Sequence, residues 1–569
     1  MSGLLKTTMA SERCLSRSQA TNLLNAGLRC LSSTYTATNE PMLEFAKGSK
    51  ETQELEKVMG QYKDPVDVPI VIGDEEIRTE LVQRQVAPFD HKRTVATFYY
   101  ATPEIIKKAI ESSLKARVDW EKRPLQERCD IFLRAADLIS KEHRMNVIAS
   151  TMLGQAKNVF QAEIDAAAEL VDFLRFDVQF AQRTTSYHPV STEPNVTKNT
   201  MVYRGLEGFW AAVCPFNFTA IGGHLPMAPA LMGNVSLWKP SDTAVLSNYT
   251  VFKIYREAGL PPGVINFVPA DGPTYGDTIT ASPHLAGLNF TGSVATFQRL
   301  WKQIGQNLDT YSNFPRLIGE CGGKNMHFVH PSADIESVAN GTVRSAYEFN
   351  GQKCSACSRL YVPESVWPKL KERFLSILSD VKMGSPLDRE NLVTAVIDAK
   401  AFARIKGYIE HAKSSPNLSI LAGGKCDDSV GYFVEPTIVL TKDPKDKIMQ
   451  EEIFGPVLTV YVYPDNQMME TVEVAKNTSP FALTAAVYVE DEAAKAQLVD
   501  AFRFNAGNFY INDKSTGSIV GQQPFGGSRR SGTNDKAGGP LYMAKFTSPQ
   551  AIKETFVPLK NWSYPSLEK

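Results

Sequence analysis

The segment NGQKCSACSR, residues 350–359, places Cys354 and Cys357 three positions apart. Such a pair suits a zinc site, a dithiol redox centre, or one nucleophilic thiolate beside a structural thiol. A structural zinc ion needs four ligands, and no second C-x-x-C motif supplies the other two. A redox pair of the thioredoxin type would follow an early strand. Because two buried structural thiols would give the same spacing, this segment alone leaves the role of both cysteines open.

Three polar residues elsewhere in the sequence each follow an apolar run that predicts a strand. Asn217 lies in CPFNF, Lys239 in WKPSD and Glu320 in GECGGKN. Open α/β sheets bind their ligands at the carboxyl ends of the strands, so these side chains are candidates for a common site. Taken singly, Asn217 suits a turn and Glu320 suits a solvated loop.

Strands and helices alternate around these residues. Apolar runs predict strands at 209–213, 235–238, 263–270, 286–293 and 316–320. Amphipathic segments at 241–260 and 294–308 predict helices, with Ser241 or Asp242 as the N-cap of the first. This alternation is typical of a doubly wound parallel sheet, the usual scaffold for a dinucleotide.

The chain contains no G-x-G-x-x-G fingerprint for a dinucleotide. What remains for a phosphate is the turn Gly292-Ser293, which opens a predicted helix where free N–H groups and the helix dipole attract an anion. Many strand-to-helix turns contain Gly-Ser for backbone reasons, so this turn does not by itself indicate a nucleotide.

A second α/β unit is predicted further along the chain. Helices are expected at 335–350, 367–381 and 492–502. Strands are expected at 459–464 and 485–490. Residues 187–205 differ from both units because they are polar, rich in β-branched residues and interrupted by proline. We interpret them as exposed strands that suit an arm for oligomerisation.

The composition is that of a globular protein with more than one domain. A chain of 569 residues exceeds one compact core, and 61 Lys and Arg residues nearly balance 62 Asp and Glu residues. No overall field therefore favours nucleic acid or an anionic membrane. The eight cysteines are sparse and irregularly spaced, which favours a reducing compartment over a disulfide framework. Residues 208–238 carry no charge, but prolines and glycines divide them, so we interpret them as buried elements and not as a membrane span.

The first 39 residues differ in composition from the rest of the chain. Four basic residues accompany a single acid, Glu12, among many Ser, Thr, Leu and Ala residues. This composition is typical of a mitochondrial presequence, and a disordered tail is the alternative. We expect residues 1–30 to be a presequence, the mature chain to begin near or after Arg29, and the protein to reach the mitochondrial matrix.

A set of motifs occurs in one order along the chain: CPFNF, WKPSD, FTGS, GECGGKN, GQKCSACSR, EEIFGPV and PFGGSRRSG. In this order they resemble the aldehyde dehydrogenase superfamily over almost the whole chain after the N-terminal tail. The longer phrases YRGLEGF, ECGGKNMHFVHPSAD and INDKSTGSIVGQQPFGG resemble one branch, the enzymes that oxidise glutamate γ-semialdehyde. Phe216 and Cys321 stand where Trp and Leu are frequent, and both keep an apolar character.

The resemblance implies an α/β fold of the aldehyde dehydrogenase type with three parts. A Rossmann-type NAD-binding domain would comprise residues 40–186 and 206–318, and an α/β catalytic domain residues 319–532. Residues 187–205 and 545–562 would form a small β arm for oligomerisation. The resemblance therefore implies a homodimer or a larger homo-oligomer.

The resemblance also implies how Cys354 acts. Its thiolate would attack an aldehyde carbon and give a thiohemiacetal, while Cys357 would be a structural thiol one helical turn away. The side chain of Asn217 and the Cys354 backbone N–H would form an oxyanion hole. After hydride transfer to NAD, Glu320 would activate water to hydrolyse the thioester.

NAD is the cofactor that the resemblance implies, and no metal is expected. The implied NAD-binding residues are Cys214, Lys239, Asp242, Gly292, Ser293, Val294, Ala295, Thr296, Glu452 and Phe454. Lys239 would bind the adenosine ribose, and Gly292 and Ser293 would face the pyrophosphate. Glu452 would hold the nicotinamide ribose, with Phe454 against the ring. The Asp242 carboxylate would repel a 2′-phosphate and so favour NAD over NADP, unless it only caps a helix.

Glutamate γ-semialdehyde carries a carboxylate and an ammonium group, and a selective site must satisfy both charges. The resemblance assigns the carboxylate to Gly517 and Ser518 in the loop KSTGSIVGQ. Ser355 and Phe525 would line the pocket, and Glu169 would lie near the ammonium group. The alternatives are a solvated loop and an ordinary acid on a helix face.

Two other functions fit the same motifs. One is a dehydrogenase for another small semialdehyde, such as succinate semialdehyde. The other is a catalytically silent member of the fold that serves in structure or binding. The catalytic residues that the resemblance implies are all present, so the sequence gives no support to the silent alternative. We expect a small-molecule substrate, no nucleic-acid partner and no membrane insertion.

Overall fold

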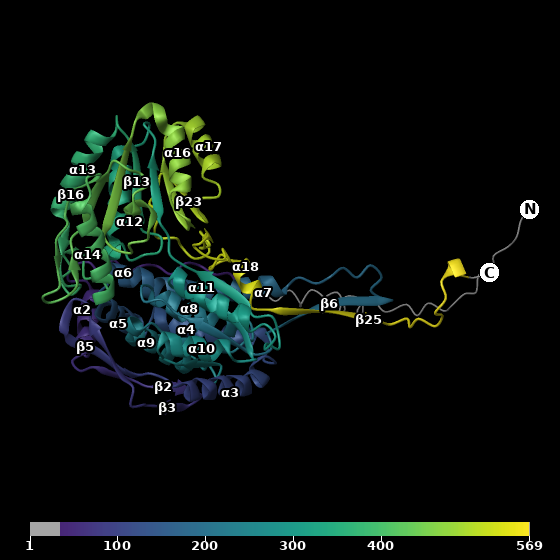
Figure 1. The fold of residues 1–569 in the computed structure, drawn as a ribbon. Helices are drawn as coiled ribbons and strands as arrows, with labels where there is room; N and C mark the ends of the chain where they lie inside the picture. The colour runs from purple at the N-terminus through teal and green to yellow at the C-terminus, as the bar shows by residue number, and fades with distance from the viewer. Residues whose placement is uncertain (1–34, 568–569) are drawn as a thin grey trace, which may run out of the picture. The chain divides into compact units, whose positions relative to one another are not determined.

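A computed structural model describes residues 35–567 of the chain, and the predicted presequence at residues 1–30 lies outside them. Within the described residues, two seven-stranded sheets form the centres of the fold, and helices pack against both (Figure 1). The parallel strands of the first sheet come from the first predicted α/β unit, and the second sheet is formed by later residues of the chain.

The first sheet has the strand order β11-β10-β7-β8-β9-β2-β3. Its strands are β2 (Ile70–Ile72), β3 (Glu75–Ile77), β7 (Phe209–Val213), β8 (Ser236–Lys239), β9 (Ile265–Phe267), β10 (Leu285–Thr291) and β11 (Arg316–Glu320). The strands β7 to β11 run parallel, as predicted, and the unpredicted hairpin β2–β3 adds an antiparallel edge. Strand order reverses between β7 and β10, and such a switch point opens a crevice at the carboxyl ends.

Helices from two parts of the chain cover this sheet. They are α3 (Pro103–Trp120), α4 (Leu125–Ser140), α5 (Arg144–Gln155), α7 (Glu169–Thr185), α8 (Thr219–Leu231), α9 (Val245–Glu257), α10 (Gly272–Thr280) and α11 (Val294–Gln306). Both α3 and α8 pack on the strands, α10 packs on α3, and α7 and α9 pack on α8. All but one residue of α8 is buried, which explains the long uncharged run. Among residues 35–567, no helix is both long and apolar enough to cross a bilayer.

The predicted capping of the helix after β8 is wrong. Ser241 precedes a short 3-10 turn, η2 (Asp242–Ala244), and α9 begins only at Val245. Neither Ser241 nor Asp242 accepts a capping hydrogen bond from that helix. Asp242 instead accepts a hydrogen bond from the Tyr100 hydroxyl at 2.5 Å. Tyr100 directly follows strand β5 (Asp90–Tyr99). The Asp242 carboxylate, which the local sequence predicts as a helix cap, is therefore bonded to a distant segment of the chain.

The second sheet has the strand order β16-β19-β20-β13-β12-β22-β23. Its strands are β12 (Asn325–Val329), β13 (Cys357–Pro363), β16 (Leu418–Ala422), β19 (Thr437–Thr441), β20 (Val457–Tyr463), β22 (Thr484–Tyr488) and β23 (Asn508–Ile511). All run parallel except β16. The predicted strands β20 and β22 are confirmed, whereas the other five are short apolar runs that periodicity does not separate from loops.

Helices α12 (Ile335–Tyr347), α13 (Trp367–Asp380) and α17 (Glu492–Ala501) confirm the predictions for this unit, and α14 (Ala399–Ser414) and α16 (Met468–Asn477) were not predicted. Both faces of β12 are buried. Met326 and Phe328 belong to one apolar cluster, and Val329 belongs to another. A parallel strand covered on both sides reads as a continuous apolar run.

Residues 187–205 form a strand only in their second half. Strand β6 (Thr197–Arg204) pairs antiparallel with β25 (Ser548–Thr555), and the two form a separate ribbon (Figure 1). Residues 187–196 form no strand, since they include prolines that cannot donate to a ladder. Every residue of β25 after Ser548 is exposed.

Candidate active site

Cys354 lies in a turn that follows α12 and that a regular helix could not form. Phe349, Asn350 and Gly351 have φ angles of 48°, 55° and 66°, so the chain turns through the left-handed region three times in succession. A Cβ atom on Gly351 would lie 2.4 Å from a backbone carbonyl oxygen, which restricts this position to glycine. The turn leaves Cys354 partly exposed just before β13, at the amino ends of the strands of the second sheet.

Cys357 is a buried thiol with a different environment. It is 2% exposed and opens β13, where its N–H donates to Ser345 Oγ at 3.2 Å. The prediction that the two cysteines are one helical turn apart is therefore wrong, because a strand begins at the second. Within residues 35–567, no group of three or more His, Cys, Asp or Glu side chains is placed to hold a metal ion. Of the two cysteines, Cys354 is the one that a small molecule can reach.

One asparagine fixes the Cys354 turn. Asn325 Nδ2 donates to Cys354 O at 2.6 Å and to Ala356 O at 3.0 Å, and Asn325 Oδ1 accepts from Thr484 N at 3.0 Å. Asn325 opens β12 and Thr484 opens β22, so two neighbouring strands hold the turn. The sequence analysis did not single out Asn325, although it is the last residue of GECGGKN.

Asn217, which follows β7, reaches the same turn from the first sheet. It is 4% exposed, and its Nδ2 donates to Gln352 O at 3.0 Å. An amide nitrogen carries two hydrogens, so one remains for an oxygen atom near Cys354. The predicted pairing of Asn217 with the cysteine turn is thus present in the geometry, and it arises from residues more than a hundred positions apart.

Glu320 is the last residue of β11. Both of its carboxylate oxygens are buried, and neither has a hydrogen-bond partner of normal geometry among the described residues. Burial raises the pKa of this carboxyl group well above its usual range, Asp535 adds to the rise, and Lys536 opposes it. Gly526 packs so closely that a Cβ there would lie 2.9 Å from Glu320 Oε1. The sequence analysis missed both Asp535 and Lys536.

The same low-dielectric surroundings act on the nucleophile candidate. Burial raises the pKa of the Cys354 thiol above its usual range, and the carboxyl groups of Glu320, Glu452 and Glu169 add to the rise. Without a bound ligand the thiol is therefore protonated at neutral pH. Its reactivity depends on what enters the site and which carboxyl group takes the proton.

The turn at residues 292–296 adjoins Glu320. Gly292 N donates to Glu320 O at 3.1 Å, and Ser293 caps α11 by accepting from Thr296 N at 3.3 Å. Ser293, Ala295 and Thr296 are exposed, and Val294 is half-buried. The first turn of a thirteen-residue helix is therefore accessible to an anion beside Glu320. This arrangement fits the pyrophosphate of a dinucleotide.

Lys239, Cys214 and Asp242 come together at the ends of β7 and β8. Cys214 N donates to Lys239 O at 3.0 Å, and Lys239 Nζ lies 3.2 Å from Pro240 O and 4.0 Å from Asp242 Oδ1. The Asp242 side chain as a whole is 45% exposed, but its Oδ1 atom is buried without a hydrogen-bond partner among the described residues. A cation and an acid at adjacent strand ends fit the hydroxyl groups of a ribose.

Glu452 and Phe454 approach the site from the second sheet. Glu452 Oε1 accepts from Gly323 N at 2.8 Å, and burial raises the pKa of this acid to about 7. Gly322 packs closely on this acid, since a Cβ there would lie 2.0 Å from Glu452 Oε1. Phe454 has φ 54° and meets the ring of Phe216 edge to face at 5.8 Å. The structure thus brings the predicted cofactor residues of both units together.

A buried hydroxyl network connects the predicted substrate loop to the cysteine turn. Ser355 O accepts from Ser515 Oγ and from Thr484 Oγ1, both at 3.1 Å. His327 Nε2 lies 3.1 Å from Ser515 Oγ, and burial lowers the pKa of this histidine to about 3, so the ring is neutral. The network fixes the start of the loop that carries Ser518.

The tip of this loop stays open. Gly517 is exposed with φ 79°, and Ser518 is half-buried. Phe525, further along, is fixed by its N–H, which donates to Ala537 O at 2.9 Å. The structure therefore leaves Gly517 and Ser518 accessible just after Ser515, which donates to Ser355 O.

Glu169 opens α7 next to a buried ionic cluster that the sequence analysis missed. Its Oε2 atom is buried without a partner among the described residues, and burial raises the pKa of the carboxyl group well above its usual range, with Asp165 adding to the rise. Asp165 itself pairs with Lys157 and with Lys353 Nζ, the latter at 3.3 Å. The one signal in the sequence is the charged Lys353 directly before Cys354.

Comparison with known proteins assigns this geometry to a family. The model of the aldehyde dehydrogenase family matches residues 78–552. The chain belongs to the aldehyde dehydrogenase family. The resemblance that the motifs indicate is confirmed, and so is the fold that it implies.

Relatives of this aldehyde dehydrogenase chain cover nearly its whole length. It is 59% identical over 546 residues to a human (Homo sapiens) protein named mitochondrial delta-1-pyrroline-5-carboxylate dehydrogenase, covering 95% of this chain and 97% of the relative. The solved structure of the Mycobacterium tuberculosis delta-pyrroline-5-carboxylate dehydrogenase bound with NAD matches at TM-score 0.90 and 43% identity, covering 94% of this chain and 98% of that one. A Thermus 1-pyrroline-5-carboxylate dehydrogenase with bound NAD matches at TM-score 0.85 and 32% identity, covering 92% and 100%.

Alkylation tests which thiol of this family member is reactive. We expect iodoacetamide to label Cys354 and not Cys357, because the first is partly exposed and the second is buried. Since the pKa of Cys354 is raised, its labelling rate should still increase as the pH passes the usual thiol pKa of about 8.5, and NAD should change the rate.

Peptide mapping by mass spectrometry separates this label from one on Cys426, which is also partly exposed. Cys357→Ala is the matched control and should leave the rate unchanged. Label found mainly on Cys357 would contradict the assignment.

Proposed function

We propose that this chain oxidises L-glutamate γ-semialdehyde, which forms from 1-pyrroline-5-carboxylate, to L-glutamate with NAD as cofactor. This reaction is the second oxidation of proline breakdown. The observation that carries the proposal is the match to the human protein named mitochondrial delta-1-pyrroline-5-carboxylate dehydrogenase, at 59% identity over 97% of its length. The convergence of three residues from different elements supports it, since Cys354 precedes β13, Asn217 follows β7 and Glu320 ends β11.

Cys354 is the proposed nucleophile. Its thiol loses a proton, and its sulfur adds to the aldehyde carbon to form a C–S bond and an oxyanion. Asn217 supports the oxyanion, since its amide already lies against the turn and retains one free hydrogen. Asn325 keeps the turn rigid, so the donors need no rearrangement when the charge develops.

NAD fits the residues that the sequence analysis assigns to it. The open N-terminus of α11 suits the pyrophosphate, and Lys239 and Glu452 suit the two riboses. When bound, NAD supplies the hydride acceptor that turns the thiohemiacetal into a thioester. The negative charge of Asp242 beside Lys239 disfavours a 2′-phosphate and supports NAD over NADP.

Glu320 is the proposed base for the second half of the reaction. Its carboxylate removes a proton from water, the resulting hydroxide adds to the thioester carbon, and the Cys354 thiolate leaves as glutamate forms. The raised pKa favours such a role, because a carboxylate with a pKa nearer neutrality is a stronger base than an exposed one. Lys536 prevents the pKa from rising further.

Substrate recognition is assigned to both ends of the amino acid. Ser518 and the backbone at Gly517 bind the α-carboxylate, and Glu169 lies near the ammonium group. Ser355 and Phe525 line the pocket between them. An unpartnered buried oxygen on Glu169 supports its part, because a buried acid without a donor gains most from an incoming cation.

Domain boundaries, assembly and location complete the proposal. Residues 40–186 with 206–318 form the NAD-binding domain, and residues 319–532 form the catalytic domain. Each domain contains one of the two seven-stranded sheets, except that the last two residues of β11 lie beyond the boundary. The human and bovine (Bos taurus) relatives are named mitochondrial, and we assign this chain to the matrix, with residues 1–30 as its presequence. N-terminal sequencing of the mature protein tests this assignment, and a start at Met1 would contradict it.

The β6–β25 ribbon is the proposed oligomerisation element. An isolated pair of strands is marginally stable in water, and this pair exposes Val202 and Ile552, each 41% accessible, followed by exposed Phe556 and Val557. A second subunit would cover these side chains. Deleting residues 545–562 should therefore lower the mass measured by sedimentation velocity, and an unchanged oligomer would contradict the proposal.

Glu320→Gln should separate the two halves of the reaction. Glutamine is similar in shape but cannot take a proton, so thioester hydrolysis should slow by about a hundredfold or more while the first turnover is retained. Stopped-flow absorbance should show a burst of NADH followed by slow turnover. If the rate of the NADH burst and the steady-state rate fell equally, Glu320 would have a role other than thioester hydrolysis.

A set of aldehydes tests the substrate assignment. Wild-type kcat/KM should be highest for glutamate semialdehyde, with Cys354→Ala as the inactive control. Ser518→Ala should lower kcat/KM for this substrate by about tenfold, since a hydrogen bond to a charged group contributes about 1.5–3 kcal/mol. Hexanal lacks the carboxylate and should lose little. Equal losses for both aldehydes would mean that the loop supports the fold and does not bind the substrate.

A further inference from the structure

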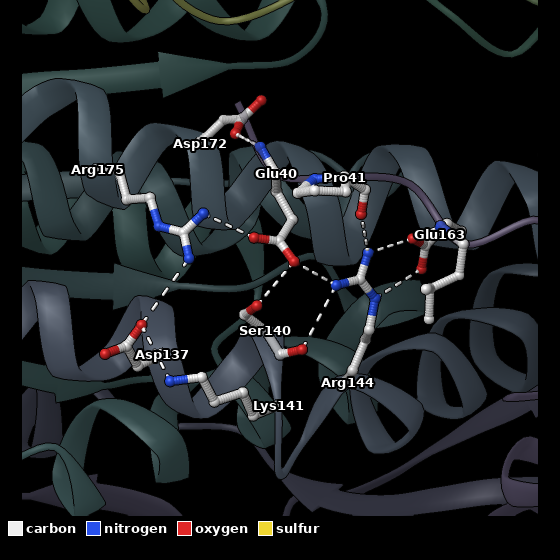
Figure 2. A network of polar contacts seen from close by, with 10 residues as sticks. Glu40, Pro41, Asp137, Ser140, Lys141, Arg144, Glu163, Asp172 and Arg175 are labelled. Atoms are coloured by element: carbon white, nitrogen blue, oxygen red, sulfur yellow. Dashed lines mark hydrogen bonds and ion pairs between the residues drawn. The ribbon is translucent and has the colours of Figure 1, made fainter. Parts of the chain in front are cut away.

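The segment that precedes helix α2 (Lys50–Met59) is fixed to the body of the protein by a buried ionic network (Figure 2). We call residues 39–43 the N-terminal strap. The Glu40 side chain is 6% exposed and accepts hydrogen bonds from Arg144 Nη1 at 2.5 Å, Arg175 Nη1 at 2.6 Å and Ser140 Oγ at 2.7 Å. Helices α4, α5 and α7 therefore all hold the strap.

The network continues from Arg144 to a second acid. Arg144 also pairs with Glu163, and it donates to Pro41 O at 2.8 Å (Figure 2). Leu43 N donates to Glu163 Oε1 at 2.8 Å. Breaking one partner of a buried ion pair leaves an uncompensated charge, so the strap is a constitutive part of the fold.

Asn39 uses its whole amide group to join two distant elements. Its Nδ2 donates to Asp172 Oδ2 at 2.7 Å and to Val520 O at 2.9 Å, and its Oδ1 accepts from Gln522 Nε2 at 2.9 Å. Glu40 N donates to the other Asp172 oxygen at 2.6 Å. Asp172 lies on α7, whereas Val520 and Gln522 end the loop that carries Ser518.

Both elements that Asn39 joins carry residues of the proposed substrate site. Asp172 follows Glu169 by three positions on α7, so the two acids share one face of the helix. The loop is held at its start by Ser515, through His327 and Ser355 O. Asn39 holds its other end, and residues 517–518 lie between the two attachments.

Apart from Asn39, the far end of the loop is held by a backbone hydrogen bond from Gly521 N to Gly538 O at 3.3 Å and by close packing of Gly521 on α7. Gly521 has φ 81°, and a Cβ there would meet the ring of Phe176 on α7 at 2.3 Å. The loop thus lies close on α7 at this point, but an apolar contact does not fix the orientation of the loop backbone. The hydrogen bonds of Asn39 fix this orientation, because they require the Val520 carbonyl to face Asn39.

We propose that Asn39 is a positioning residue for substrate selection: its amide fixes the loop of Ser518 relative to the helix of Glu169. The ligand class is an aldehyde that carries both a carboxylate and an ammonium group. A loop held in place before binding loses less conformational entropy on binding. This inference rests on the proposed function, since it requires that the two elements bind the two charged groups.

Two substitutions at Asn39 test the inference on the full-length enzyme. Asn39→Ala removes the bridge, and Asn39→Asp keeps its shape and acceptor but removes the donor and faces Asp172 with a second carboxylate. Each should lower kcat/KM for glutamate semialdehyde by about five- to tenfold, mainly through KM, which corresponds to one or two lost hydrogen bonds. The value for hexanal should change by less than about twofold.

Control variants and a second measurement complete the test. Met42→Ala alters a strap residue that is 52% exposed and should match the wild type. Gln522→Ala removes one contact of Asn39 from the loop side and should give a smaller loss of the same kind. Hydrogen exchange at residues 517–522 should be faster in Asn39→Ala. If Asn39→Ala does not fold, the change in kcat/KM of Gln522→Ala for the two aldehydes tests the inference alone.

The outcomes separate this inference from the proposed function. A wild type without preference for glutamate semialdehyde over hexanal would overturn the proposed function itself. A wild type with that preference, together with equal losses for both aldehydes in the variants, would overturn the role of Asn39 only. Unchanged hydrogen exchange in the loop would also contradict that role.

Discussion

The site depends on the hydrogen bonds that Asn325 makes to the Cys354 turn. Three successive residues with positive φ bring Cys354 away from α12, and such a turn has no ladder of its own to hold it. Asn325 replaces that ladder by binding the carbonyl oxygens of Cys354 and Ala356 while β22 holds its own side chain. Gly323 permits this arrangement, because a Cβ there would lie 2.9 Å from Cys354 O.

Burial of ionisable groups is the second constraint on the site. Burial raises the pKa values of Glu320, Glu169 and Glu452, and that of the Cys354 thiol, so these groups tend toward their neutral forms in the free protein. Charge is concentrated instead behind the turn, where Asp165 is paired with two lysines.

Two sheets meet these constraints by bringing different groups to one place. The first sheet contributes Asn217, Lys239 and Glu320 at the ends of its parallel strands, and the second contributes the cysteine turn and Glu452. The N-terminal strap then connects α7 to the end of the loop at 514–522. Chemistry, cofactor contact and substrate selection therefore lie on separate elements that share few residues.

Much of this organisation could be predicted from local sequence. Apolar runs predicted β7 and β11 with the correct ends, and Gly292-Ser293 was correctly placed at the start of α11, because a strand or a helix start depends on residues within a few positions. The order of the motifs identified the family.

Other features were decided by the tertiary structure alone. The expected cap by Asp242 failed because Tyr100 takes its carboxylate, and the expected helical turn before Cys357 failed because a strand begins there. Asn39 and Val520 are 481 positions apart, and no periodicity or spacing relates them. Buried polar groups pair with whatever donor the packed fold brings near, so such contacts exist only once the chain has folded.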